Sequence, residues 1–132
     1  MLRASLAWLL ALACWPFAAK ADAAPDVDFE RHVAKTLLRH CAGCHNVSDA
    51  KGGLDLTQRA TALAGGESQM PAITPNEPDN SYLLERIRSG EMPPAGKGQN
   101  VTAEELAWLE TWIQAGAVWP QDRVLSPFEL TS

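Results

Sequence analysis

Three closely spaced residues combine two thiols with an imidazole. Cys41 and Cys44 are separated by two residues, and His45 follows the second cysteine directly. Two thiols at this spacing can form a disulfide, act as a thioredoxin-like redox pair or supply half of a zinc site. No stretch of the sequence alternates like a β-strand, as the redox pair would require, and only His32 and His40 remain nearby as further zinc ligands. The pattern C-x-x-C-H is instead typical of covalent haem attachment.

The spacing explains how these residues can hold one haem. Side chains at positions i, i+3 and i+4 of a helical turn project to the same side, so Cys41, Cys44 and His45 can face a single cofactor. Two thiols on that side can add to the two haem vinyl groups, and the adjacent imidazole can then bind the iron. We therefore expect one covalent haem c per chain, with His45 as the proximal iron ligand.

Two methionines, each followed by proline, are candidates for the second iron ligand. Met70 lies 25 residues beyond His45, inside a loop rich in glycine and proline, whereas Met92 lies 47 residues beyond it. The longer separation leaves enough chain for a short helix to pass round the haem. The two prolines after Met92 also restrict the backbone there. We therefore predict Met92 as the distal ligand and Met70 as a loop residue at the haem edge.

An N-terminal helix is expected to deliver Cys41 to the cofactor. Asp26 and Asp28 can each cap its start. His32 and His40 lie on this helix or beside it, and we expect them to be exposed or flanking residues, not iron ligands. The apolar residues of the helix repeat every four positions, at Phe29, Val33 and Leu37.

A C-terminal helix has the clearest start signal. Thr102 and Glu105 form a capping box, and Gly116 is expected to end the helix. Its apolar stripe is expected to pack against the N-terminal helix, with the haem between them. The indole of Trp112 or Trp119 could also donate to a haem propionate, although packing is the more usual role of such residues. The stripe consists of Leu106, Trp108, Leu109, Trp112 and Ile113.

The chain between these helices is expected to form loops and two short helices. The first short helix is expected at Ala60–Leu63, and the glycines and prolines of residues 65–80 predict a loop. The second, capped by Asn80 or Ser81, is expected to stop at Gly90.

Length and composition limit the classes of protein to which the chain can belong. It has 132 residues, of which 46% are hydrophobic and 20% charged, with a net charge of −5. These values fit one globular domain and exclude a multidomain enzyme, a multispan membrane protein and a fully disordered chain. The acidic balance argues against general nucleic-acid binding, which needs a basic face.

The first 21 residues resemble a secretory signal peptide. A basic start at Arg3 precedes an apolar run from Ser5 to Ala19, and Ala19-Lys20-Ala21 matches a signal cleavage pattern. The apolar run is shorter than the roughly 20 residues that a membrane span needs. We therefore expect an exported protein located in the periplasm or cell envelope.

Two consequences follow from this leader. Cys14 resembles the cysteine of a lipoprotein signal, so membrane association is expected if that cysteine is lipidated or if the signal is retained. Cleavage after residue 21 would remove Arg3 and Lys20, leaving 9 basic against 16 acidic side chains and a net charge of −7. Any redox partner protein, whose identity the sequence does not reveal, is then expected to present a basic surface.

An ordered set of short motifs resembles the planctomycete-type cytochrome c domain. The resemblance spans roughly residues 29–119 and implies a small all-α fold like that of class I cytochromes c, with His45 and a distal methionine on the iron. Glu91-Met92-Pro93-Pro94 matches the distal motif of that family. The other matching stretches are Cys41-Ala42-Gly43-Cys44-His45, Lys51-Gly52-Gly53-Leu54-Asp55-Leu56, Gly65-Gly66-Glu67-Ser68, Ser81-Tyr82-Leu83-Leu84 and Trp112-Ile113-Gln114-Ala115-Gly116-Ala117.

The resemblance also suggests a division of the chain. Residues 1–21 are expected to be the signal peptide, residues 22–119 the cytochrome c domain, and residues 120–132 a tail or linker. In that family the domain usually begins a longer secreted protein, so this chain is expected to be the N-terminal part of a longer polypeptide or a truncated product.

Three functions are compatible with a haem domain of this kind. An iron ligated by histidine and methionine changes by one electron without losing a ligand, which favours electron transfer. A peroxidase-like enzyme would need an open distal site, and a distal arginine and histidine suited to cleaving peroxide are not apparent in the sequence. A haem-based sensor or structural module of a larger secreted protein is the third alternative. We expect electron transfer because Met92 is available to close the site.

Overall fold

The chain folds into helices joined by long loops. The computed structural model describes residues 26–131, and this part contains no β-strand, which confirms the all-α prediction. The predicted signal peptide, its cleavage site and Cys14 lie outside the described residues. None of the helices within residues 26–131 has the length and apolar character that a membrane span requires.

The N-terminal helix consists of two segments. A π-helical segment, η1 (Phe29–Ala34), continues into α1 (Lys35–His40). Asp28 is the capping residue, because its carboxylate accepts a hydrogen bond of 2.8 Å from the backbone N–H of Arg31. The repeating apolar residues face inward as predicted, since Val33 and Leu37 are fully buried.

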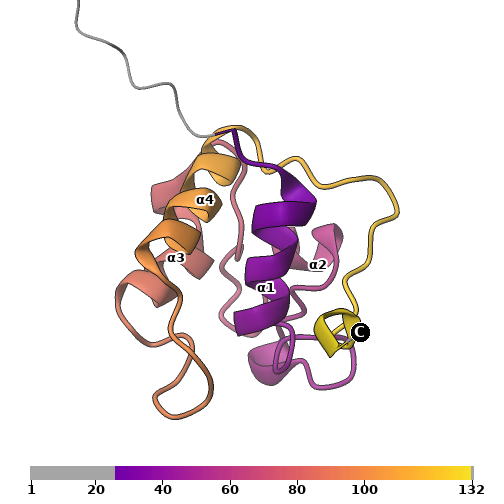
Figure 1. Ribbon diagram of the computed structural model, residues 1–132. Helices are drawn as coiled ribbons and strands as arrows, with labels where there is room; N and C mark the ends of the chain where they lie inside the picture. The colour runs from indigo at the N-terminus through magenta and orange to yellow at the C-terminus, as the bar shows by residue number, and fades with distance from the viewer. Residues whose placement is uncertain (1–25, 132) are drawn as a thin grey trace, which may run out of the picture.

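The C-terminal helix, α4 (Ala103–Gln114), begins at the predicted capping box. The Thr102 hydroxyl accepts from the Glu105 N–H at 3.1 Å, and the Glu105 carboxylate accepts from the Thr102 N–H at 2.9 Å. Leu109 and Ile113 are fully buried. Figure 1 shows α4 beside the helix formed by η1 and α1, and η1 and α4 pack against each other as predicted. The expectation that the haem lies between these two helices is wrong, because they contact each other directly and no residue of α4 lines the cavity described below.

Short helices and loops make up the middle of the chain. The helical turns are η2 (Lys51–Gly53) and η3 (Pro78–Asn80), and the α-helices are α2 (Arg59–Ala64) and α3 (Tyr82–Arg88). Ser81 precedes α3 as predicted, but its hydroxyl does not bond to the helix. It accepts from the Thr74 N–H at 2.9 Å and lies 3.0 Å from the Glu77 carbonyl oxygen, to which it donates. Through these two bonds the Ser81 hydroxyl holds the loop that precedes α3.

Two adjacent glycines bring the loop after α2 against the turn at η2. The Glu67 N–H donates to the Gly52 carbonyl oxygen at 2.8 Å. A Cβ atom on Gly65 would lie 2.0 Å from the Met70 carbonyl oxygen, and one on Gly66 would lie 2.3 Å from the Gly52 carbonyl oxygen. The absence of side chains at these two positions is what permits the close approach.

The indoles of the two buried tryptophans point to backbone carbonyls. Trp112 Nε1 donates to the Val118 carbonyl oxygen and Trp119 Nε1 to that of Arg123, both at 2.8 Å. Both rings also pack against Phe29, with ring centroids 5.9 and 4.8 Å away. The propionate role considered for Trp112 or Trp119 is therefore wrong, because each indole N–H already has a protein partner and neither residue lines the cavity described below.

The segment after α4 packs back onto the domain, and Figure 1 shows it passing down beside α1. It ends in the helical turn η4 (Glu129–Thr131). Leu125 is buried, and its N–H donates to the Thr57 carbonyl oxygen at 2.9 Å. Arg123 forms ion pairs with Glu30 at 2.8 Å and with Glu129 at 2.7 Å. Residues 120–131 are thus attached to the helical domain, and the predicted division at residue 119 stays a prediction.

Candidate functional site

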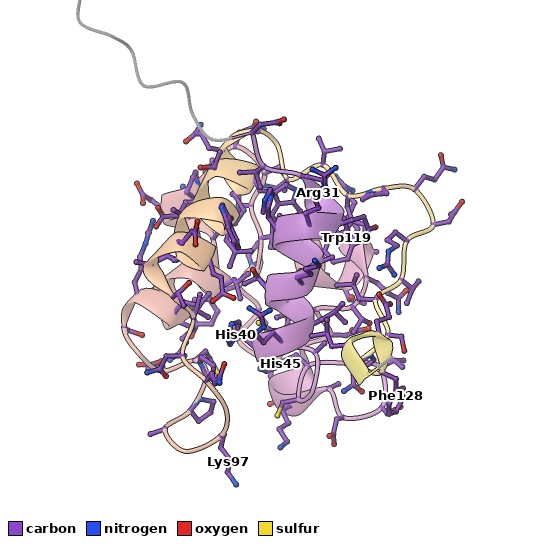
Figure 2. The ribbon with its side chains drawn as sticks, in the orientation of Figure 1. Arg31, His40, His45, Lys97, Trp119 and Phe128 are labelled. Carbon is purple, nitrogen blue, oxygen red and sulfur yellow. The ribbon has the colours of Figure 1, made fainter. Side chains whose placement is uncertain are left out.

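A cavity of about 560 Å³ lies between the end of α1, the turn at η2, the loop after α2, α3 and the loop before α4. Its volume falls in the range of roughly 300–1,000 Å³ that small-molecule and cofactor sites occupy. Figure 2 shows His40 and His45 near the C-terminal end of α1, with Lys97 at the tip of the loop that precedes α4. Much of the wall is apolar, with Leu54, Leu56, Ala72, Leu83, Ile87 and Pro93 among its residues.

The predicted haem-attachment residues meet at this cavity. Cys41, Cys44 and His45 all line it. The chain continues in a helical turn after α1, because the His45 N–H donates to the Cys41 carbonyl oxygen at 2.9 Å. This turn places the three side chains at one cavity, as the i, i+3, i+4 spacing predicts. Both cysteines are free thiols, so the structure does not support the disulfide alternative.

The environment of Cys41 keeps its sulfur protonated. Burial raises the pKa of the Cys41 thiol to about 12, and the neighbouring Cys44 and Glu105 act in the same direction. A redox-active C-x-x-C pair needs a cysteine whose pKa is lowered so that it ionises readily, and Cys41 shows the opposite shift.

The imidazole of His45 has a nitrogen that no other residue satisfies. Its Nδ1 atom is buried and has no hydrogen-bond partner among the described residues. A buried polar atom without a partner costs about 1–3 kcal/mol, so a protein retains one where a role explains it. The available imidazole, the two free thiols, the apolar wall and the cavity volume together fit a covalently held haem.

Both candidate methionines reach the cavity. Met92 and Met70 line it, and the two residues are 36% and 48% exposed. The N–H groups of Glu91 and Met92 donate to the Arg86 carbonyl oxygen at 3.0 and 3.1 Å, which fixes Met92 to the end of α3. The Met70 N–H donates to the Ser68 hydroxyl at 3.3 Å. Distance along the chain therefore does not separate the two candidates.

The two other histidines occupy different environments. His32 Nδ1 accepts from the Asp28 N–H at 2.9 Å, and its ring packs against Trp108 away from the cavity. His40 lines the cavity next to Cys41 and thus flanks the site, but its side chain is buried and not exposed. Its side chain is 2% exposed, and its Nε2 atom lies within hydrogen-bond distance, 3.0 Å, of a Glu105 carboxylate oxygen. A zinc ion bound by Cys41 and Cys44 would gain no ligand from either residue, because His32 lies away from the cavity and both ring nitrogens of His40 contact other groups.

Sequence reasoning missed two groups at the cavity. Arg86 lies over the ring of Tyr82, with 4.6 Å from its guanidinium carbon to the ring centroid, and it also pairs with Glu91. The i, i+4 spacing of Tyr82 and Arg86 on a predicted helix could have indicated their contact. The contact between His40 and Glu105 joins residues 65 positions apart, so no local sequence pattern could have predicted it.

The all-α fold, with a cavity that has the C-x-x-C-H segment in its wall, is consistent with a small cytochrome-like domain. Residues 41–96 match the model of the family described as Planctomycete cytochrome C, so this segment of the chain is similar to that family. The matched residues include Cys41, Cys44, His45 and Met92, and the family indicates haem binding and electron transfer. Comparisons with curated proteins and with solved structures gave no match.

Proposed function

We propose that this chain is an exported electron-transfer domain that holds one haem c through Cys41 and Cys44 and binds the iron through His45 and Met92. The observation that carries the proposal is the meeting of these four residues at one cavity, within the segment that matches the cytochrome c family. When bound, the haem supplies an iron that is reduced and oxidised by one electron at a time.

The residues of the chain have separate tasks in this proposal. Cys41 and Cys44 hold the cofactor by covalent bonds, and His45 and Met92 hold the metal from its two sides. Apolar side chains such as Leu56 and Leu83 exclude water from the site. A dry site that keeps both ligands in place changes little in structure when one electron is gained or lost, which favours fast transfer.

Covalent attachment tests this proposal most directly. Wild-type protein co-expressed with haem-attachment machinery should carry haem that stays with the chain on a denaturing gel. Cys41→Ser and Cys44→Ser should each leave at most one thioether bond, and the double variant should lose covalent haem. Both native cysteines line the cavity, so their loss removes the bonds without removing His45. Noncovalent haem in the wild-type protein would contradict the proposal.

A peroxidase-like activity is the alternative function that two residues of the cavity wall could support. Arg86 and His40 both line the cavity, and these are residue types that assist peroxide cleavage. Arg86, however, is paired with Glu91 and bonded to Tyr82, and both ring nitrogens of His40 contact other groups. Neither side chain is free to act on a substrate, which supports electron transfer. Steady peroxide turnover by the holoprotein, far above that of free haem, would overturn this choice.

A further inference from the structure

The loop that carries Met92 has little regular structure of its own. We use the term distal loop for residues 91–101, between α3 and α4. Most of its residues are exposed, while Pro93 is buried. At its start, the Arg86 carbonyl oxygen accepts from the N–H groups of Glu91 and Met92. The loop continues into α4 at its other end, so its exposed middle can move unless a further contact limits it.

His40 supplies that further contact. Its Nδ1 atom lies 2.8 Å from the carbonyl oxygen of Gln99, near the end of the distal loop, and its Nε2 atom lies 3.0 Å from a Glu105 carboxylate oxygen. Both partners offer oxygen acceptors, so each ring nitrogen of His40 faces a hydrogen-bond acceptor. The side chain is almost fully buried, and a hydrogen bond in such surroundings is stronger than one in water.

Glu105 is itself held in place and cannot follow the ring. One of its oxygens accepts from Arg39 at 2.7 Å, and the other accepts from the Thr102 N–H at the start of α4. His40 is therefore clamped between a fixed carboxylate and the distal loop. Its neighbour in the chain is Cys41, so the same short segment contacts the loop and the predicted point of haem attachment.

We infer that His40 is a positioning residue that holds the distal loop, and with it Met92, over the haem cavity. The inference rests on the proposed function for its consequence at the iron, but the attachment of the loop itself is a property of the chain. His40 binds no metal in this account, because both of its ring nitrogens are engaged by Gln99 and Glu105.

Two substitutions separate the two bonds of His40. The amide nitrogen of Asn occupies nearly the position of histidine Nδ1, so His40→Asn can keep the bond to Gln99 and lose that to Glu105. The amide nitrogen of Gln is close to the position of Nε2, so His40→Gln can keep the bond to Glu105 and lose that to Gln99. We expect His40→Gln to loosen the distal loop and His40→Asn to preserve it.

Hydrogen exchange on the full-length holoprotein measures the loop. The N–H groups of Glu91, Met92 and Lys97 are all bonded within the described residues. In His40→Gln their exchange should be about tenfold faster, as expected for the loss of a buried hydrogen bond that holds the loop. In His40→Asn it should stay close to that of the wild type. Equal exchange in the two variants would overturn the inference.

Imidazole binding to the ferric holoprotein provides a second readout at the iron. His40→Gln should bind imidazole about tenfold more tightly, because a looser Met92 yields its place more readily. His32→Gln is the matched control, since His32 is on the same helix, bonds Asp28 and lies away from the cavity. It should change neither hydrogen exchange in the distal loop nor imidazole binding. If His32→Gln and His40→Gln have equal effects, His40 only stabilises the fold in general and does not position the loop.

Failure of the proposed function would appear differently. If the haem is not covalently held, or if the wild type lacks the near-infrared band of a ferric methionine–haem bond, then the ligand assignment fails. The difference in loop exchange between His40→Asn and His40→Gln would still be expected, because it depends on Gln99 and not on the iron. If hydrogen exchange in the distal loop changes but imidazole binding does not, His40 holds the loop as inferred. The claim that it also holds Met92 at the iron would then be wrong.

Discussion

At the scale of single residues, the cavity wall contains two methionines, Met70 and Met92. His45 provides one axial ligand in our proposal, so Met70 and Met92 compete for the other. Met92 is bonded through its backbone to Arg86 and is followed by the buried Pro93, and a stiff support preserves a weak iron–sulfur bond. We therefore retain Met92 as the ligand.

Substitution of each methionine tests this assignment. Met92→Ala should remove the near-infrared band of the ferric methionine–haem bond, lower the reduction potential and open the iron to carbon monoxide. Met70→Ala, a change of the same size in the same cavity, should do none of these. The reverse pattern would move the ligand to Met70, and no effect from either variant would exclude both.

The sequence was most informative about residues whose partners are close along the chain. The C-x-x-C-H spacing predicts that Cys41, Cys44 and His45 lie together, because one helical turn connects them. The environment of His40 could not be predicted in this way. Its partners, Gln99 and Glu105, are about sixty residues away, and their approach depends on how α1, the distal loop and α4 pack.

At the scale of elements, local capping signals were reliable guides. Asp28 and the Thr102–Glu105 capping box begin the helices where the sequence predicts, because each signal satisfies N–H groups of its own first turn. Ser81 differs because its hydroxyl has a tertiary partner in the loop at Thr74. The packing of residues 120–131 was also not predicted, since Leu125 and Arg123 find their partners far back in the chain.

Arg123 is expected to hold that last segment in place. Arg123→Gln removes the ion pairs with Glu30 and Glu129 and should lower the free energy of unfolding by about 1 kcal/mol, the usual limit for partly exposed pairs. It should also speed protease cleavage within residues 120–131. Urea unfolding and timed proteolysis measure the two effects.

Arg88 provides the control for this prediction. It forms a comparable pair of contacts, with Asp79 and Glu110, between α3 and its neighbours. Arg88→Gln should reduce stability by a similar amount without faster cleavage of residues 120–131. Equal cleavage of the two variants would show that Arg123 has no special role in attaching the segment.

At the scale of the whole molecule, two carboxylates predict how stability depends on pH. Hydrogen bonds from Arg123 and from the Ser126 N–H lower the pKa of Glu129 from 4.5 to about 2. For Glu105, burial opposes ionisation, but hydrogen bonds from Thr102 and His40 outweigh it and lower the pKa below 4.5. The folded state therefore binds these protons less readily than the unfolded state.

The contribution of both carboxylates should be complete above their ordinary pKa and lost as the pH falls through the lowered values. The free energy of unfolding should thus decline from about pH 5 towards pH 2, as followed by urea unfolding at each pH. Glu105→Gln and Glu129→Gln should each flatten this decline. Glu104→Gln is a suitable control, because Glu104 is exposed on the first turn of α4. A wild-type curve without slope below pH 5 would contradict the prediction.

Overall charge should govern long-range association with a partner. If residues 1–21 are removed, the net charge is −7, and electron transfer to a basic acceptor protein should slow as the salt concentration rises. The cavity wall itself contains Lys51, Arg86 and Lys97 against a single carboxylate, Glu67. Faster transfer to an acidic acceptor at low salt would therefore show that this local charge, and not the net charge, directs docking.

The two adjacent glycines after α2 set a limit on how this domain can vary. Gly65 and Gly66 are pressed against the backbone carbonyl oxygens of Met70 and Gly52, so even alanine would require the main chain to separate there. The same step brings the Met70 loop and the turn at η2 together as one wall of the cavity. A change of an apolar side chain in the wall leaves this backbone contact in place, whereas any side chain at Gly65 or Gly66 would force the two segments of the wall apart.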